Sequence, residues 1–296
     1  MDFSGFLVVL SIIIPATIRS ATPLIFAALG GNFSEKSGVV NIGLEGIMTV
    51  GAFSAVYFSY LTGSPWIGLL GAILAGGLFG LLLAFLSINF KANQVVVGTA
   101  INILAASLTT FLLVAIWKRP GQTNTVNSFS NFGPFNMFTY LAFALVLVSY
   151  YVMFKTPFGL RMRAVGEHPK AADTLGVNVY VTRYICVILS GVLAGIGGAS
   201  LSIGSLSLFK EGMIAGKGFI ALAALIFGKW NPIGAAGACL FFGFAVALET
   251  VSNNLPIPRE FIFAMPYILT MLAVSGLIGK SVAPAASGVP YEKGER

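Results

Sequence analysis

Apolar residues dominate the chain in nine runs, separated by short stretches rich in polar residues, glycine or proline. A membrane-spanning helix needs about 20 apolar residues to cross a hydrocarbon core of about 30 Å. The runs have roughly that length, although the first contains Arg19 and the seventh is short: 5–29, 39–61, 66–88, 95–117, 137–154, 184–207, 213–228, 233–251 and 261–279. We predict an all-α, polytopic transmembrane helical bundle of about nine spans.

Composition supports this prediction. The 296 residues are 57% hydrophobic and only 9% charged, whereas about a quarter of the residues in soluble domains are charged. Lipid tails solvate apolar side chains directly, so a membrane protein does not need a charged surface. The most polar stretches, 118–136, 155–183 and 280–296, lack the apolar periodicity of a separate core. We therefore expect residues 1–296 to form a single transmembrane domain.

The basic residues predict an orientation. If 155–183 is cytoplasmic and the spans alternate, eleven basic residues lie inside and five outside. Those inside are Lys36, Lys91, Lys155, Arg161, Arg163, Lys170, Arg183, Lys229, Lys280, Lys293 and Arg296; those outside are Lys118, Arg119, Lys210, Lys217 and Arg259. The positive-inside rule then places the tail 280–296 in the cytoplasm. It also explains the net charge of +7 without a nucleic-acid partner.

Glycine and proline positions carry further structural information. Gly76-x-x-x-Gly80 and Gly191-x-x-x-Gly195 would let helix backbones approach closely. Short Pro-Gly helix starts, Ser64-Pro65-Trp66-Ile67-Gly68 and Asn231-Pro232-Ile233-Gly234, precede two apolar runs on opposite sides of the membrane in this orientation. That relation is expected of an inverted repeat, although Pro also favours the first turn of any helix.

Several polar residues fall at the starts of apolar runs and are candidates for a substrate path: Asn41, Glu45, Asn93, Gln94 and Asn102. A charge at the centre of a membrane helix costs about 2.5–3.5 kcal/mol on insertion scales, so Glu45 is a functional candidate. We favour a structural role for it, such as pairing with Lys36. Gly43 and Gly46 indicate an irregular helix start. The amides could equally bond neighbouring helices.

The sequence lacks the residues that a metal, cofactor or enzyme site would need. His168 is the only histidine, and Cys186 and Cys239 lie in apolar runs, so we expect no metal or cofactor. Gly276-Leu-Ile-Gly279-Lys280-Ser281 has too few residues between its glycines for a phosphate-binding loop. An intramembrane enzyme would need convergent polar groups, which the sequence does not provide. Nucleotide hydrolysis, where needed, must come from another chain.

The segment 155–183 contains a compact motif. Pro169 can open a short helix, which Gly176 would end. Such a helix between two spans suits docking into a groove of a cytosolic partner. On composition alone, a solvated loop explains the segment as well.

Three stretches resemble one family. RAVGEHPKAADTLGVNV resembles the cytoplasmic loop of permeases from bacterial ABC importers for simple sugars, nucleosides and branched-chain amino acids. SEKSGVVNIGLEGIMTVGAF (34–53) resembles a signature of the nucleoside-uptake subgroup, and GKGFIALAALIFGKWNPIGA (216–235) resembles a later span and turn. The resemblance implies a multi-pass permease of the bacterial cytoplasmic membrane that translocates nucleosides. Alternatives are a ribose- or galactose-type sugar permease and, from another class, an ion-coupled secondary carrier.

The resemblance also implies partners and contact residues. The partners would be a cytosolic ABC ATPase, a second permease in a heterodimer, and an extracytoplasmic solute-binding lipoprotein. The ATPase would contact the coupling residues Glu167, His168, Pro169, Lys170, Ala171, Ala172, Asp173, Leu175 and Gly176. The chain itself would be a transport subunit and not an enzyme.

Overall fold

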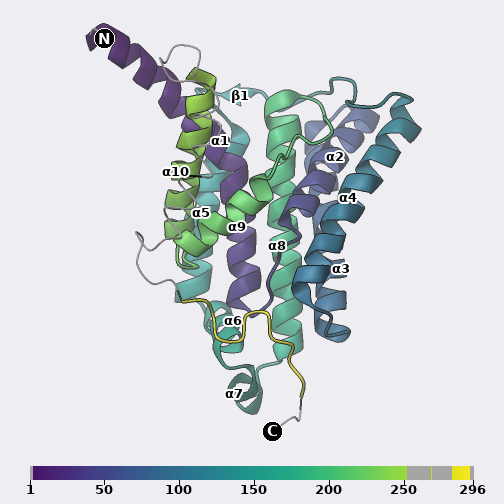
Figure 1. Ribbon diagram of the computed structural model, residues 1–296, viewed down its shortest axis with the longest axis vertical. Coiled ribbons are helices and arrows are strands. Elements are labelled where there is room, and N and C mark those ends of the chain that lie inside the picture. The colour runs from purple at the N-terminus through teal and green to yellow at the C-terminus, as the bar shows by residue number, and fades with distance from the viewer. Residues whose placement is uncertain (1–2, 252–267, 269–281, 294–296) are drawn as a thin grey trace.

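Six long helices form the body of the protein, which a computed structural model describes over residues 3–251, 268 and 282–293. They are α1 (Phe3–Lys36), α2 (Leu44–Thr62), α3 (Pro65–Ala84), α4 (Gln94–Trp117), α5 (Met137–Lys155) and α8 (Val179–Leu201). Two π-helical turns, η1 (Phe85–Asn89) and η2 (Ser202–Leu206), extend α3 and α8. The long helices run roughly along one axis, from the start of α1 at one end to α7 and the tail at the other (Figure 1).

Hydropathy predicted the spans well. Within the described residues, the six helical stretches long and apolar enough to cross a membrane are Ser11–Lys36, Leu44–Thr62, Pro65–Asn89, Gln94–Trp117, Met137–Lys155 and Val179–Leu206. They coincide with the first six predicted runs, and the predicted transmembrane helical bundle is confirmed. The ninth run, 261–279, lies outside the described residues except for its position 268.

The seventh run forms a short apolar helix, whereas the eighth forms a helix of 20 residues, as long as α3. α9 (Lys217–Phe227) has 11 residues, or about 16 Å at 1.5 Å per residue, which cannot cross the core alone. A tight turn, in which the Asn231 amide donates to the Gly228 carbonyl at 3.0 Å, leads into α10 (Pro232–Val251). Figure 1 shows α9 at mid-height in the bundle. In the irregular backbone before it, Phe209 and Ile214 are buried, whereas Lys210, Gly212 and Ala215 are exposed.

Close backbone contact joins α3 to α8. A Cβ atom at Gly80 would lie 3.1 Å from the Gly191 Cα, and one at Gly195 would lie 3.1 Å from the Gly76 Cα. The two glycine pairs face each other, so the prediction of close helix approach is confirmed.

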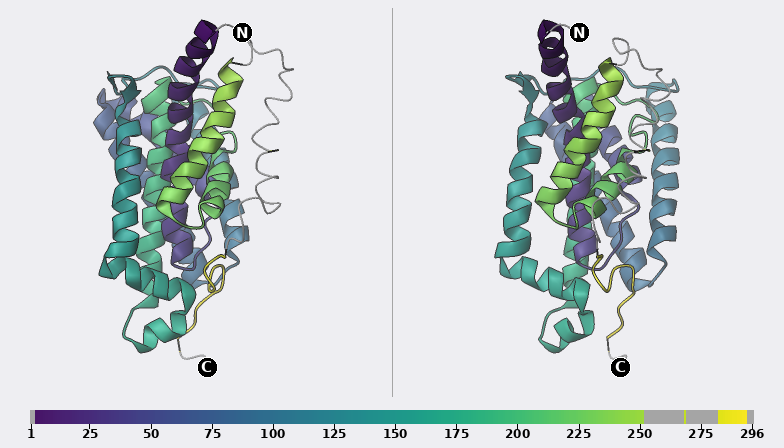
Figure 2. Two further views of the ribbon diagram at one scale, coloured as in Figure 1. Left: turned by 90° about the vertical axis from the view of Figure 1, so that its left-hand side faces the viewer. Right: turned by 60° about the vertical axis from the view of Figure 1, so that its left-hand side comes forward.

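The packing also supports the inverted repeat. α3 packs along α8, and α10 packs along α1. Both α3 and α10 begin at a proline, Pro65 or Pro232, and both views in Figure 2 show α10 alongside α1. If α1 corresponds to α8 and α3 to α10, each pair maps onto the other.

We call the end of the bundle that the predicted orientation places outside the outer end, and the opposite end the inner end. The outer end carries a loop and a small hairpin. Strands β1 (Asn131–Phe132) and β2 (Phe135–Asn136) pair antiparallel. The loop before them bonds to the chain after η2, with the Thr123 amide donating to the Phe209 carbonyl at 2.9 Å. Arg19 reaches the Pro134 carbonyl at 2.9 Å, so its guanidinium lies at this end of α1.

Candidate functional site

A broken segment separates α1 from α2. Residues 37–43 are not helical, and Gly38 has a φ of +91°. The segment reaches well into the bundle, because the Asn41 side-chain amide donates to Ser190 Oγ at 2.9 Å, near the middle of the span Val179–Leu206. The irregular helix start that Gly43 and Gly46 predicted is present, and α2 begins only at Leu44. The peptide groups of this segment need partners other than an α-helix of their own.

Two amides of α4 supply partners for this segment. Gln94 Oε1 accepts from the Val40 amide at 2.6 Å. Asn102 Oδ1 accepts from the Gly46 amide at 2.8 Å, and its Nδ2 donates to the Ile42 carbonyl at 3.1 Å. Both side chains therefore bond across helices, as one of our two readings of the amides expected. Asn93 differs from them, since it is exposed and caps the start of α4 by accepting from the Val95 amide at 2.9 Å.

Some polar atoms around the segment keep unused bonding capacity. Asn41 Oδ1 and Gln94 Nε2 are buried and form no hydrogen bond with any described residue. Gln94 and Asn93 also line a hollow of about 340 Å³ at the inner end, together with Val40 and Lys91. Of the five predicted path residues, these two lie beside an open space, whereas Glu45 and Asn102 are bonded to backbone.

Glu45 occupies the first turn of α2 and holds the start of α9. Its carboxylate accepts from the Gly216 amide at 2.8 Å and the Gly218 amide at 2.7 Å. An anion at a helix N-terminus satisfies otherwise unpaired amides and interacts favourably with the helix dipole. The arrangement gives Glu45 the structural role that we favoured, but backbone amides engage its carboxylate in place of Lys36.

Two buried ionisable groups escaped the sequence-based prediction. Glu35, only 5% exposed, accepts from the Trp230 indole at 2.6 Å and so ties the end of α1 to the α9–α10 turn. Arg183, 2% exposed, donates from Nε to the Ser37 carbonyl at 3.2 Å and from Nη1 to the Val289 carbonyl at 3.1 Å. Both residues were read as ordinary parts of a span or loop, because their acceptors and donors lie more than 100 residues away.

The segment 155–183 forms two short helices at the inner tip. α6 (Pro157–Glu167) and α7 (Pro169–Thr174) follow each other, and Figure 1 shows α7 as the lowest helix. The helix that Pro169 predicted is present, and Gly176 follows it with a φ of +81°.

The coupling residues point in different directions. Ala172 is 3% exposed and packs with Val165, Val179 and Tyr291. Leu175 is 84% exposed. The other residues are half-buried or exposed: Glu167, His168, Pro169, Lys170, Ala171, Asp173 and Gly176. A partner docking here would meet Leu175 and would not meet Ala172.

The tail crosses the inner end as a strap, residues 282–293. Its Ala286 amide donates to the Gly166 carbonyl at 2.9 Å, and its Gly288 amide donates to the Gly38 carbonyl at 3.2 Å. Tyr291 completes the cluster around Ala172. The strap therefore connects the broken segment, α6 and the α7 loop. The sequence predicted only a short cytoplasmic tail, 280–296.

Comparisons with known proteins agree with this architecture. Residues 13–274 match the protein family described as "Branched-chain amino acid transport system / permease component". The chain is 48% identical to the guanosine ABC transporter permease protein NupQ of Bacillus subtilis, over 97% of this chain and 98% of that protein. It is 43% identical to the nucleoside ABC transporter permease protein NupC of Lactococcus lactis, over 96% and 98%. It is also 24% identical to a second Bacillus subtilis protein, the guanosine ABC transporter permease protein NupP, over 88% and 80%.

Proposed function

Because this chain belongs to the family of branched-chain amino acid transport system permease components, we propose that it is the membrane-spanning subunit of an ATP-driven nucleoside importer. The assignment of the substrate rests on the 48% and 43% sequence identity, over nearly the whole chain, to permeases named for guanosine and nucleosides. The chain is a permease and not an enzyme, and ATP hydrolysis belongs to a separate subunit.

Lys36 and Lys155 end their spans, and Arg19 donates to the Pro134 carbonyl at the hairpin end. The other charges in the described spans fit a neutral solute. The carboxylates of Glu35 and Glu45 are engaged by an indole and by backbone amides, and Arg183 is bonded to two carbonyls. None of the three is placed to hold the carboxylate of an amino acid by a charge-assisted pair. Nucleosides and sugars are both neutral, so this argument disfavours amino acids only.

The α7 loop is the proposed contact with the ATPase. The residues 167–173, 175 and 176 lie at the inner tip, and Leu175 offers an apolar side chain that this chain leaves 84% exposed. A short helix with an exposed apolar side chain suits insertion into a groove on a partner. In this orientation, the strap and the C-terminus lie in the cytoplasm.

A second permease subunit completes the proposed path. The chain is similar to two Bacillus subtilis permeases that are both named for guanosine, at 48% and 24% identity. Two different permeases named for one substrate support a heterodimer. An extracytoplasmic solute-binding protein would deliver the nucleoside at the end that carries the β1–β2 hairpin.

Radiolabelled uptake tests the proposal. Cells with and without the gene are given guanosine, uridine, ribose or leucine, and a protonophore is added at constant ATP to separate an ion-coupled carrier from an ATP-driven importer. We expect deletion to abolish nucleoside uptake, with little effect of the protonophore on the wild type. Loss of ribose uptake alone would contradict the nucleoside assignment and favour the sugar permease.

A further inference from the structure

A cavity of about 290 Å³ lies between α2, α3 and α4, outside the network of amides around the broken segment. Small-molecule sites usually occupy about 300–1,000 Å³, so this cavity is just below that range. Its described lining carries no charged side chain, and its polar members are the hydroxyl residues Ser54, Tyr57 and Thr109. Aliphatic side chains and two aromatic rings form the rest.

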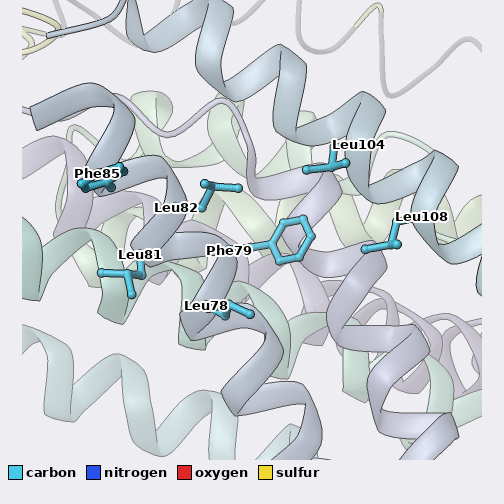
Figure 3. A pocket seen from close by; sticks show the side chains of 7 residues that line it. All are labelled: Leu78, Phe79, Leu81, Leu82, Phe85, Leu104 and Leu108. Atoms are coloured by element: carbon cyan, nitrogen blue, oxygen red, sulfur yellow. The ribbon is translucent and has the colours of Figure 1, made fainter. Parts of the chain in front are cut away.

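An apolar groove continues from this cavity toward the inner half of α3. The groove of about 540 Å³ shares Leu78, Phe79 and Leu108 with the cavity, and Figure 3 shows its leucines and phenylalanines, which lie on α3, η1 and α4. Every residue lining the groove is Leu or Phe. The hydroxyl groups are therefore confined to the cavity, where they distinguish it from a surface that only meets lipid tails.

Aromatic rings form one wall of the cavity and hold each other in place. The rings of Phe53 and Tyr57 are nearly parallel, at 10° with centroids 6.3 Å apart, one turn apart on α2. Trp117 contacts both rings edge-on, and Phe209 packs against Phe53 at 5.3 Å. Rigid aromatic faces of this kind are the surfaces on which nucleobases stack in proteins.

Several hydrogen-bonding groups at this wall have no partner. The hydroxyls of Ser54 and Tyr57 form no hydrogen bond with any described residue, whereas Thr109 donates within its own helix to Ala105 at 2.8 Å. The Trp117 indole N–H is buried and also lacks a described partner. Buried donors without partners are uncommon in folded proteins, and ligand binding is one way in which they are satisfied.

We propose that this cavity binds the base of the transported nucleoside during its passage. The proposal rests on the function proposed above and adds a position for the substrate within this chain. The base stacks on the Phe53 and Tyr57 rings, and the free hydroxyls bond its polar edge or the ribose. A neutral aromatic solute matches an uncharged wall of this composition, whereas a free sugar offers no aromatic face for the rings.

Uptake kinetics of the complete transporter test the position. Ala75 lines the cavity on α3 and Ala106 is exposed on α4, so Ala75→Leu fills the cavity and Ala106→Leu is its matched control. We expect Ala75→Leu to raise the KM for guanosine more than the KM for the smaller uridine, and Ala106→Leu to change neither. Tyr57→Leu removes one stacking face and should raise both KM values by about 10-fold.

A second pair of variants adds no volume and covers the case in which Ala75→Leu fails to fold. Ser54→Ala removes a free hydroxyl from the cavity, and Ser107→Ala makes the same change at an exposed position of α4. We expect the first to raise the KM about 2- to 10-fold, the range of one neutral hydrogen bond, and the second to leave it unchanged.

The outcomes separate this proposal from the assigned function. A wild-type transporter that moves no nucleoside would overturn the function itself. A wild type that transports nucleosides, with unchanged KM values in Tyr57→Leu and Ser54→Ala, would overturn the cavity alone. Phospholipid that co-purifies with the wild type and is lost from Ala75→Leu at unchanged KM would identify the cavity as a lipid site, which would also overturn the proposal.

Discussion

Replacing Glu45 measures how strongly α2 holds the start of α9. The carboxylate accepts two backbone N–H groups, from Gly216 and Gly218, at 2.8 and 2.7 Å. Hydrogen bonds to a charged group contribute about 1.5–3 kcal/mol each. Gly218 is buried, whereas Glu45 and Gly216 are half-buried, so water can replace part of the lost bonding in a variant. We therefore expect Glu45→Ala to lower the free energy of unfolding by about 2–4 kcal/mol, and Glu45→Gln, which keeps one acceptor oxygen, by about half as much.

Thermal unfolding in detergent, followed by tryptophan fluorescence, is the measurement. At roughly 2–4 °C per kcal/mol for a chain of this size, Glu45→Ala should lower the Tm by roughly 5–10 °C. Glu292→Gln is the control, because it removes a carboxylate from an exposed ion pair with Lys91 that contributes at most about 1 kcal/mol. If Glu45→Ala keeps the wild-type Tm and loses uptake, the carboxylate acts on the substrate and the structural assignment is wrong.

Three further predictions concern the inner tip, the orientation and the glycine contact. Leu175→Ala should weaken binding of the ATPase by about 10-fold or more, because full burial of a Leu side chain contributes about 1.5–3 kcal/mol. The Tm of the variant should be unchanged. Normal ATPase binding and uptake would show that Leu175 is not part of the interface. Cysteine at the exposed position Ser130 should react with an impermeant thiol reagent in intact cells and cysteine at Val282 should not, and the reverse pattern would invert the orientation. Gly195→Ala should lower the Tm, because its Cβ would lie 2.5 Å from a carbonyl oxygen of α3. Gly237→Ala is the control and should not lower it, because no atom lies within 4 Å of a Cβ there. Equal Tm values for the two variants would show that the helix contact can relax.

Local patterns predicted the features that depend on neighbouring residues. Apolar runs gave the long helices, because crossing a membrane fixes both length and composition. Pro65 and Pro169 marked helix starts, and Gly43 with Gly46 marked the broken start of α2. In each of these cases, the residues that determine the structure are adjacent in sequence.

Features that depend on distant partners were not predictable. Glu45 was recognised as unusual, but its donors lie 171 and 173 residues away. Arg183 was counted only among the inside charges, and 280–296 was expected only to be a short cytoplasmic tail. A hydrogen bond from the Arg183 guanidinium to the Val289 carbonyl joins the two. The run 213–228 was noted as short, but its pattern did not show that the helix is confined to Lys217–Phe227 and that residues 213–216 stay outside it.

The strap gives the chain a fixed order of completion during synthesis. Val289 is made 106 residues after Arg183, which at translation rates of about 5–20 residues per second is a delay of about 5–20 s. Throughout that interval, the guanidinium lacks one of its two acceptors and the Ala172 cluster lacks Tyr291. A chain that terminated before the strap would keep both defects at this end, which the proposed orientation exposes to cytoplasmic proteases. The strap residues would thus distinguish a chain that contains them from one that stops short of them.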